Sequence, residues 1–398
     1  MSAPQRIAVL GSTGSVGVNT LDVISRDPGR FEVFALTAST QVEKLLAQCV
    51  QFKPAYAVMA SAAHGRELED KCNALGLSTR VLLGPESIAR VASDERVDTV
   101  MAAIVGAAGL QACVQAAQAG KRLLLANKEA LVVGGEVFLQ AVARGGAKLL
   151  PIDSEHSAIF QSLPADPASW AQQIDKLILT ASGGPFRTRD PASLRDVTPE
   201  QACAHPNWVM GRKISVDSAT MMNKALEVIE ARYLFGVHAG QIDVLIHAQS
   251  VIHSMVQFKD HSIVAQMGTP DMRVPIAYGL SWPTRMRSGA AALDFSSLAA
   301  MTFESIHTAD HQQRFPGLKL AWQVLDAPVG TPAVLNAANE VAVAAFLERQ
   351  IRFDQIHAVN EASLSAVRVH QAGSIDELLA LDAEARSVAA GFICGLAP

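Results

Sequence analysis

Cysteine and aromatic residues are scarce in this 398-residue sequence, which has five cysteines and an aromatic fraction of 5%. The cysteines form no C-x-x-C pair, so we expect neither a disulfide framework nor a cysteine-based metal site. A reducing, cytoplasmic location is therefore expected. The longest apolar run, residues 100–110, is too short to span a bilayer, and we expect no membrane partner.

Charge is also limited. The formal net charge is -5 and no basic run is present, which argues against a nucleic-acid partner. Residues 1–10 lead directly into a strand-like segment and leave no room for a signal peptide. The 49% hydrophobic and 18% charged content is typical of a folded globular protein, and the length predicts two or three domains.

The first part of the chain alternates short apolar runs with helical patterns. Strands without polar alternation, separated by helices, favour a parallel sheet that is covered on both faces. Residues 1–150 therefore predict an α/β domain with a Rossmann-like doubly wound parallel sheet. The predicted strands lie at residues 6–10, 31–36, 55–59, 98–103, 121–125 and 148–152.

The rest of the chain has a different pattern. Residues 151–285 contain strand-like segments at 174–180, 244–247, 250–258 and 262–266, and we expect a central α+β catalytic domain. Residues 286–316 show no clear period and are interpreted as a linker. Residues 317–398 predict a C-terminal helical bundle, with helix-start signals at Thr331-Pro332 and Ser374 to Glu377.

A glycine-rich turn follows the first strand. Gly11, Gly14 and Gly17 have the spacing G-x-x-G-x-x-G and precede a helical segment. Such a turn lets the backbone approach a pyrophosphate, whose charge is met by N–H groups at the helix start, although a plain strand-to-helix turn is the alternative. After the second strand, Ser39-Thr40-Gln41 offers hydroxyls and no acid for a ribose 2′-OH, which favours NADP over NAD.

A second polar segment, Asn127-Lys128-Glu129, follows another predicted strand. Ligands of such folds bind at this edge of the sheet, so these side chains suit the nicotinamide and ribose end of a dinucleotide. An exposed helix start with Asn127 as its cap is an equal alternative.

Three carboxylates are candidates for a divalent metal. Asp153 and Glu155 follow a strand, and in extended backbone residues i and i+2 face the same side. Oxygen ligands favour Mg²⁺ or Mn²⁺. The alternative is an ordinary helix start with an acidic first turn. Glu227, on a predicted helix, supplies a third carboxylate, and Glu230 is a rival on nearly the same face.

Short polar donors suited to a phosphate accompany these acids. His205 is a further candidate donor, although a lone histidine is more often structural. Trp208 lies in a loop for which Gly211 is the predicted hinge, and it either covers a small polar substrate or packs at a core edge. We expect residues 218–227 to form one helix, whose early residues bind phosphate while Glu227 reaches the metal. The candidate donors are Ser182, Ser218, Asn223 and Lys224.

At this point the sequence resembles the 1-deoxy-D-xylulose 5-phosphate reductoisomerase family, in order over nearly the whole chain. The resemblance implies NADPH-dependent conversion of 1-deoxy-D-xylulose 5-phosphate to 2-C-methyl-D-erythritol 4-phosphate, an early step of non-mevalonate isoprenoid biosynthesis. It also implies a homodimer with the middle domain's sheet near the interface. The matching segments are residues 11–15, 126–130, 153–156, 182–186, 205–208, 213–227, 249–254 and 335–340.

The resemblance also assigns residues. It implies a metal, Mg²⁺ or Mn²⁺ with Co²⁺ possible, at Asp153, Glu155 and Glu227. The implied catalytic set is Lys128, Asp153, Glu155, His205 and Glu227, with proton transfer by Glu155 or a water at the metal. Substrate contacts match Lys128, Ser154, Glu155, Ser182, His205, Ser218, Asn223, Lys224 and Glu227. Cofactor contacts match Thr13, Gly14, Ser15, Val16, Ser39, Thr40, Gln41, Asn127, Glu129 and Gly211.

The sequence departs from the family at Ser39-Thr40-Gln41, where many members have a basic triplet. The departure bears on the strength of the NADPH preference and not on the reaction. The main alternative function is another metal-dependent NADP dehydrogenase of a sugar phosphate. A hydroxy-acid dehydrogenase would need no phosphate pocket, and a sugar-phosphate sensor would need no metal triad.

Overall fold

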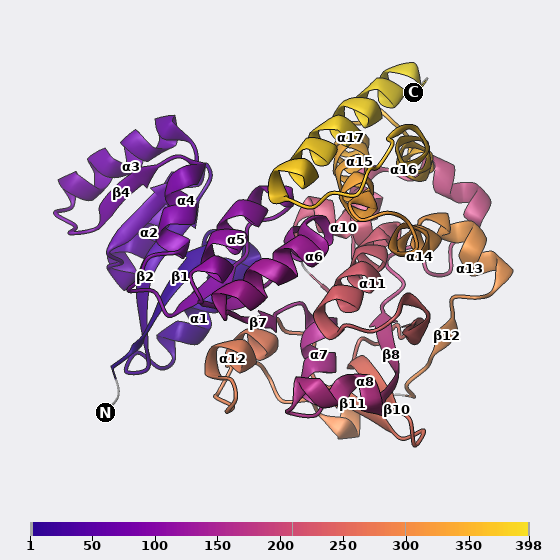
Figure 1. Cartoon of the computed structure of the whole chain (residues 1–398), viewed down its shortest axis with the longest axis horizontal. Helices are drawn as coiled ribbons and strands as arrows, with labels where there is room; N and C mark the ends of the chain where they lie inside the picture. Colours follow the sequence, from indigo (N-terminus) through magenta and orange to yellow (C-terminus); the bar gives the residue numbers. More distant parts are fainter. Residues whose placement is uncertain (1–2, 209, 299, 397–398) are drawn as a thin grey trace. The chain divides into compact units, whose positions relative to one another are not determined.

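The computed structural model describes residues 3–208, 210–298 and 300–396 (Figure 1). They form two compact units. Unit 1 comprises residues 3–130, 138–154 and 271–290, and unit 2 comprises residues 131–137, 155–270 and 291–396. Within the described ranges, no helix has both the length and the apolar content that crossing a membrane requires.

Unit 1 contains the predicted parallel sheet. Its seven strands run in the order β4-β3-β2-β1-β5-β6-β7, and every pairing is parallel. The strand β4 was not predicted from the sequence; it is a four-residue edge strand that is only partly buried. The strands are β1 (Gln5–Leu10), β2 (Phe31–Ala38), β3 (Tyr56–Met59), β4 (Arg80–Leu83), β5 (Thr99–Ala102), β6 (Arg122–Leu125) and β7 (Lys148–Pro151).

The chain reverses its direction of sheet growth at β1, which lies between β2 and β5. Ligands of doubly wound folds bind outside the carboxyl ends of the strands at such a switch point. The glycine turn at residues 11–14 follows β1, so it lies at this position. The helices that connect the strands are α1 (Ser15–Ser25), α2 (Val42–Phe52), α3 (Ala62–Ala74), α4 (Pro85–Ala92), α5 (Leu110–Gln118) and α6 (Lys128–Gly145).

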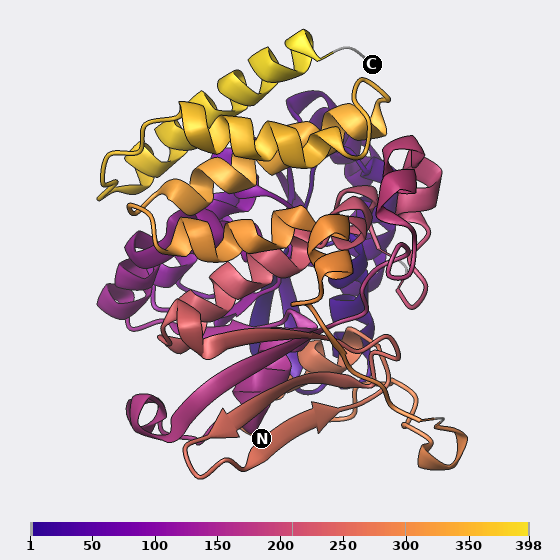
Figure 2. The same cartoon turned by 90° about the vertical axis from the view of Figure 1, so that its right-hand side faces the viewer.

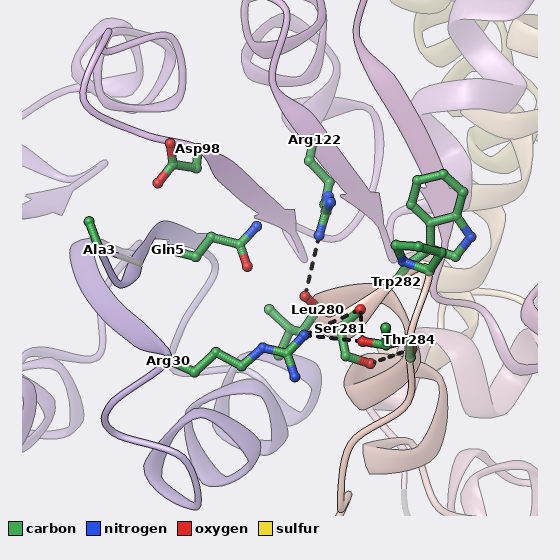
Figure 3. Close-up of a pocket in the computed structure, with 10 residues that line it drawn as sticks. Ala3, Gln5, Arg30, Asp98, Arg122, Leu280, Ser281, Trp282 and Thr284 are labelled. Atoms are coloured by element: carbon green, nitrogen blue, oxygen red, sulfur yellow. Dashed lines mark hydrogen bonds between the residues drawn. The ribbon is translucent and has the colours of Figure 1, made fainter. Parts of the chain in front are cut away.

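A later helix, α12 (Arg273–Ser281), returns to unit 1. Its last carbonyls accept hydrogen bonds from two arginines: Arg122 donates to the carbonyl of Leu280 at 3.4 Å, and Arg30 donates to that of Ser281 at 3.3 Å (Figure 3). Cations stabilise the negative end of a helix dipole. A cavity of about 580 Å³ lies beside these contacts.

Unit 2 is built around a mixed sheet with the strand order β11-β10-β8-β9-β12. Only β8 and β9 pair in parallel, and the other neighbours are antiparallel. The segment expected to be an irregular linker contains β12 and helix α13 (Ala309–Arg314), so it is more ordered than predicted. The strands are β8 (Ile174–Ala181), β9 (Ile242–Ile246), β10 (Ile252–Phe258), β11 (Ile263–Met267) and β12 (Glu304–Ser305).

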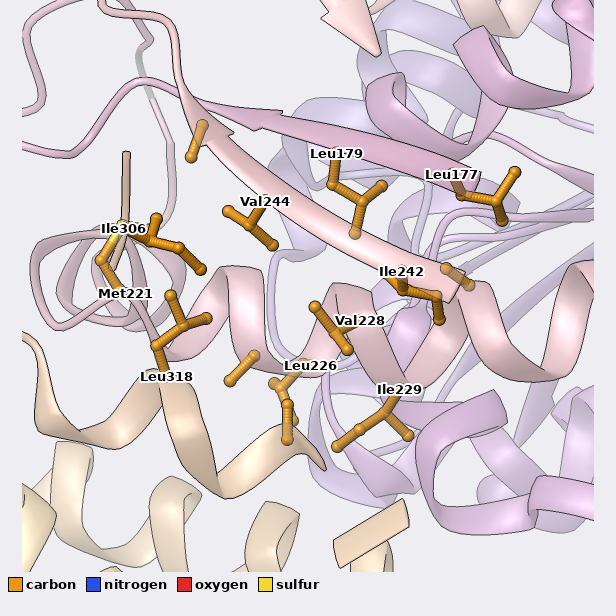
Figure 4. Close-up of a cluster of buried hydrophobic side chains, with 14 of the residues drawn as sticks. Leu177, Leu179, Met221, Leu226, Val228, Ile229, Ile242, Val244, Ile306 and Leu318 are labelled. Carbon is orange, nitrogen blue, oxygen red and sulfur yellow. The ribbon is translucent and has the colours of Figure 1, made fainter. Parts of the chain in front are cut away.

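The core of unit 2 lies between β8, β9 and helix α11 (Met222–Phe235). Leu177 and Leu179 of β8 pack with Val244 of β9 and with Leu226 and Ile229 of α11 (Figure 4). Burying one such side chain contributes about 1.5–3 kcal/mol. The helix that carries the predicted metal and phosphate residues is therefore fixed by its apolar side chains against the sheet.

The remaining helices of unit 2 include the predicted C-terminal bundle (Figure 2). Ser374 begins the last helix with a capping box to Glu377, as predicted. Thr331 is not a cap, because Gly330 holds that position with a left-handed backbone and Thr331 is the first helical residue. The helices are α7 (Ser154–Ser162), α8 (Trp170–Gln173), α9 (Pro199–Cys203), α10 (Arg212–Ala219), α14 (Leu320–Leu325), α15 (Thr331–Leu347), α16 (Gln355–Ala366) and α17 (Ile375–Gly395).

Candidate active site

The segment 213–227 folds into two helices, and the prediction of a single helix was wrong. Helix α10 ends at Ala219 and α11 begins at Met222. Between them Met221 has φ 61°, a left-handed backbone that interrupts the helix. Sequence periodicity did not reveal this break because Met is an unusual residue at positive φ. Ser218 thus lies near the end of α10, whereas Lys224 and Glu227 lie in the first turns of α11.

The three candidate metal ligands are close together. One carboxylate oxygen from each of Asp153, Glu155 and Glu227 lies within 4.8 Å of the others. Glu155 is in the first turn of α7 and not in extended backbone, so the predicted strand geometry was wrong while the predicted proximity is observed. Asp153 and Glu155 are two residues apart in sequence, and the boundary between the two units falls between them, after Ser154. Three oxygen donors at this spacing fit a small divalent cation such as Mg²⁺.

Lysines accompany the carboxylates. The Nζ of Lys224 lies 2.9 Å from Oε1 of Glu155 and also donates to Glu227, while Lys128 pairs with Asp153. Burial opposes the charge of Lys224, but the charges of Glu155 and Glu227 outweigh burial and raise the pKa of Lys224 above its ordinary value. Lys224 is therefore a buried cation next to two acids.

A histidine supports Glu227 from the neighbouring helix. The Nε2 of His156 lies 2.9 Å from the backbone oxygen of Glu227, and its Nδ1 lies 3.3 Å from Oε2 of Glu230. His156 and Glu230 are fully buried. A carbonyl oxygen only accepts, so Nε2 carries a proton and donates it to Glu227. Sequence reasoning gave His156 no role, because its partner is a main-chain atom 71 residues away.

The predicted phosphate donors include a fixed pair. Nδ1 of His205 accepts from the backbone N–H groups of Asn207 and Trp208, at 3.1 and 3.0 Å. Its Nε2 therefore carries the ring proton and donates to Oγ of Ser182 at 2.9 Å. Burial lowers the pKa of His205, and the charge of Glu155 acts in the opposite direction. A neutral imidazole thus orients the Ser182 hydroxyl.

The turn that carries Ser182 lies against the helix that carries Ser218. Gly184 has φ +65°, and a Cβ at this position would lie 2.7 Å from the backbone oxygen of Ser218. Any larger residue would separate the two segments. Glycine at 184 therefore brings two predicted phosphate donors, Ser182 and Ser218, to neighbouring positions.

The glycine turn of unit 1 has the geometry of a close backbone approach. Gly11 has φ +76°, and a Cβ there would lie 2.6 Å from the backbone oxygen of Ala103. A Cβ on Gly17 would lie 2.5 Å from the backbone oxygen of Gly11. Gly14 and Ser15 are exposed at the start of α1. The turn thus presents N–H groups of a helix start to solvent, which suits an anionic ligand.

Two side chains make hydrogen bonds to loops of unit 1 that follow its strands, and sequence analysis did not predict one of them. Gln48 of α2 donates to the backbone oxygen of Ser12 at 2.9 Å and accepts from the Ser12 hydroxyl at 2.7 Å. No motif indicated Gln48. Asn127 caps α6 by accepting from Ala130, and its amide also donates to Gly106 at 3.0 Å. The predicted cap is confirmed, but the helix start is buried and not exposed, since Asn127 is 2% exposed, and its direct contact with a cofactor stays a prediction.

Comparison with known proteins matches this arrangement over three segments. Residues 7–135 match the family model for 1-deoxy-D-xylulose 5-phosphate reductoisomerase, residues 149–235 match its C-terminal domain, and residues 267–388 match a further C-terminal domain of the same enzyme. The reductoisomerase of Pseudomonas paraeruginosa is 54% identical over 391 residues, or 98% of each chain. That of Cupriavidus taiwanensis is 55% identical over 384 residues, or 96% of this chain and 97% of the other.

The chain belongs to the 1-deoxy-D-xylulose 5-phosphate reductoisomerase family.

Solved structures of reductoisomerases show the same fold. One, in complex with NADPH, fosmidomycin and magnesium, has a TM-score of 0.92 at 42% identity and covers 98% of both chains. The Zymomonas mobilis reductoisomerase in complex with NADPH has a TM-score of 0.91 at 43% identity and covers 99% of this chain and 100% of that one. The predicted family and fold class are therefore confirmed.

Within the reductoisomerase fold, the predicted residues fall into two groups. Unit 2 brings together Glu155, Lys224, Glu227, Asn223 and the Ser182–His205 pair, and Ser218 lies beside the Gly184 turn. Gly211, a cofactor candidate, is the exposed cap residue of α10 in the same unit. Unit 1 holds the other cofactor candidates, which are Thr13, Gly14, Ser15, Val16, Ser39, Thr40, Gln41, Asn127 and Glu129.

Proposed function

We propose that this chain catalyses the NADPH- and divalent-metal-dependent rearrangement and reduction of 1-deoxy-D-xylulose 5-phosphate to 2-C-methyl-D-erythritol 4-phosphate, a step of non-mevalonate isoprenoid precursor biosynthesis. The observation that carries the proposal is the carboxylate cluster of Asp153, Glu155 and Glu227 in a chain that matches reductoisomerases over nearly its whole length. A plain dehydrogenase of unphosphorylated substrates would have no use for the phosphate donors proposed beside that cluster.

The three carboxylates would hold Mg²⁺ or Mn²⁺, with Co²⁺ as a further candidate. When bound, the cation supplies a Lewis acid that polarises substrate oxygens. The protein residues have separate tasks. Lys224 balances the charge of Glu155 and Glu227, and His156 fixes the backbone of Glu227. Lys128, which pairs with Asp153, would contact the substrate.

The substrate phosphate would be bound by short donors at a distance from the reacting carbons. Ser182 accepts from His205 and from the backbone N–H of Gly184, so its own proton remains available to a phosphate oxygen. Ser218 lies next to this turn, and Asn223 and Lys224 follow on α11. Ser154 starts helix α7 beside the metal ligands and completes the proposed contacts.

The dinucleotide would bind at the carboxyl edge of the sheet in unit 1. Its pyrophosphate would lie at the residues 13–16 turn, and its adenosine ribose at Ser39, Thr40 and Gln41, all of which are exposed. Asn127 and Glu129 would contact the nicotinamide end, and Gly211, the cap residue of α10, is a further proposed cofactor contact. We keep the four-part division at residues 150, 285 and 316 as a proposal for the functional domains.

We also propose a homodimer that forms through β11. This strand is at the edge of its sheet and has only β10 as a neighbour among the described strands (Figure 2). Ile263 and Val264 on β11 are 52% and 43% exposed. An exposed edge strand with β-branched side chains pairs readily with another strand. Val264→Lys should shift the mass measured by light scattering from twice the chain's mass toward one, while the exposed control Val50→Lys should not.

A cytoplasmic location completes the proposal. All five cysteines are free, and burial raises the pKa of Cys49 and Cys113 to about 12. Thiols that stay protonated react slowly with oxidants, and free cysteines are usual in proteins of a reducing compartment.

The decisive assay measures NADPH oxidation with 1-deoxy-D-xylulose 5-phosphate, with and without Mn²⁺. We expect oxidation that requires both the metal and the phosphate group, and unphosphorylated deoxyxylulose is the control. Oxidation that is independent of metal would defeat the proposal. NMR of the product separates the alternative, another NADP dehydrogenase of a sugar phosphate, because only the reductoisomerase yields a branched carbon skeleton.

A further inference from the structure

A chain of buried polar side chains joins the C-terminal helices to α10. Asn339 of α15 donates to Oδ1 of Asp217 in α10 at 2.7 Å, and Asn360 of α16 donates to Oδ1 of Asn339 at 3.2 Å. Nζ of Lys213 lies 2.8 Å from the other oxygen of Asp217. Asp217 is 1% exposed and both asparagines are 0% exposed. Three helices of unit 2 therefore meet at directional contacts inside its core.

These contacts specify position more than they add stability. Burying an amide or a carboxylate costs free energy unless each group is hydrogen-bonded. In other proteins, replacing buried charged groups by apolar residues of similar size is often neutral or stabilising. The surroundings are apolar, since Ala338 and Ala342 of α15 and Val216 and Ala219 of α10 belong to one core cluster. The bonds of Asn339 to Asp217 and of Asn360 to Asn339 form only when the helices have one relative position and register, although Oδ1 of Asn360 itself has no hydrogen-bond partner among the described residues.

The residue after Asp217 is Ser218, which is partly exposed where Asp217 is buried. The backbone of Ser218 also packs closely against the glycine turn. A Cβ at position 184 would lie 2.7 Å from the backbone oxygen of Ser218. One end of an eight-residue helix is thus held between a turn and a buried hydrogen-bond network. A small shift of α10 would separate Ser218 from Ser182.

We propose that Asn339, Asn360 and Asp217 are positioning residues for the substrate phosphate. They fix α10 so that Ser218 and Ser182 face the same phosphate group, and none of them touches the substrate. The inference rests on the proposed function, which gives Ser218 its phosphate contact. Asn339 lies in residues 335–340, one of the segments that match the family, and the inference assigns this segment a role.

The test is a steady-state comparison of variants. Asn339→Ala is expected to raise the KM for 1-deoxy-D-xylulose 5-phosphate about tenfold or more, as expected for loss of a well-placed charged hydrogen bond. The kcat and the KM for NADPH should stay near wild type. Asn339→Asp should raise the substrate KM further, because two carboxylates would then face each other. The reversed pair Asp217→Asn with Asn339→Asp restores an amide–carboxylate contact and should recover most of the substrate affinity.

A matched control separates positioning from general destabilisation. Arg386→Ala removes contacts to Glu340 and Asp382 at 2.6 Å each, on the same helix bundle. It should lower Tm without raising the substrate KM. If Arg386→Ala lowers Tm as much as Asn339→Ala does and raises the substrate KM equally, the inference is overturned. An unchanged substrate KM in Asn339→Ala would also overturn it. If Asn339→Ala does not fold, Asn360→Ala is the second variant, because it leaves the bond between Asn339 and Asp217 in place. It should raise the substrate KM by a smaller factor, and an unchanged KM would overturn the inference.

Ser218→Ala distinguishes the possible failures. A wild-type protein that does not turn over the substrate would defeat the proposed function. Turnover with a normal KM in Ser218→Ala would remove the phosphate contact on which the inference rests. A raised KM in Ser218→Ala together with a normal KM in Asn339→Ala would defeat only the positioning role.

Discussion

The ammonium of Lys224 and the carboxylate of Glu155 are 2.9 Å apart although they come from different helices, α11 and α7. The same ammonium contacts Glu227 within its own helix. One buried cation therefore holds together two of the three proposed metal ligands. Under the proposed function Lys224 also binds the substrate phosphate, which would make it the residue where charge balance and substrate binding meet.

Lys224→Gln should separate these roles. Without the ammonium, Glu155 and Glu227 repel each other, so the metal-free protein should unfold at a lower temperature than wild type. A bound divalent cation relieves that repulsion, so the rise in Tm on adding Mn²⁺ should be larger than in wild type. Differential scanning fluorimetry with and without Mn²⁺ measures both. Lys176→Gln, which removes an exposed lysine 3.9 Å from Asp243, is the control and should change neither. A smaller metal response in Lys224→Gln would contradict the assigned charge balance.

Glu227→Gln should abolish turnover while the dinucleotide still binds. The variant keeps the size of the side chain and removes one charged oxygen donor from the cluster, and we expect a loss of about a hundredfold or more. Binding of NADPH, followed by fluorescence titration, should be unchanged because the nucleotide turn belongs to unit 1. Full activity in this variant would remove Glu227 from the metal site. Glu230→Gln is the informative comparison, because Glu230 contacts His156 and belongs with Asp153 and His156 to a second group whose ligand atoms lie within 4.8 Å of one another.

Much of this site was predictable from the sequence, and the rest depends on tertiary structure. The parallel sheet and the glycine turn followed from apolar runs and from Gly11, whose positive φ is a local requirement. The break between α10 and α11 did not, because Met221 carries no sequence signal for a left-handed backbone. Contacts of His156 with Glu227 and of Asn339 with Asp217 join residues far apart in sequence. Residue types suggested the chemistry, but only the packing of helices determined which groups meet.

Thr40→Lys should strengthen the preference for NADPH over NADH. Ser39, Thr40 and Gln41 are exposed at the end of β2, and none is charged. An ammonium at position 40 would attract a 2′-phosphate, so the ratio of kcat/KM for NADPH to that for NADH should rise about tenfold. The gain should shrink in high salt, since the site is exposed. Thr40→Gln is the matched control of similar length without charge. An equal ratio in the two variants would place the 2′-phosphate elsewhere.

The stability of the protein should fall in mild acid because of His311. Burial, with the charges of Arg314 and His307, lowers the pKa of His311 from 6.5 to about 4, while a backbone contact at Ile306 acts in the opposite direction. The unfolded chain therefore binds a proton at higher pH than the folded chain does. The contribution of neutral His311 is complete above pH 6.5 and is lost as the pH falls toward 4.

His311→Asn should flatten this dependence. Asparagine cannot titrate, so the drop in Tm between pH 7 and pH 5 should be smaller than in wild type, even if the variant loses the ring contact with Phe315 at 5.0 Å and is less stable at pH 7. The slope of Tm against pH is the diagnostic quantity, because a lost packing contact shifts the curve without changing its slope. The exposed His370→Asn is the control and should keep the wild-type slope. A wild-type slope in His311→Asn would mean that other buried groups, such as His205 or His253, whose pKa values are also lowered by burial, dominate the acid response.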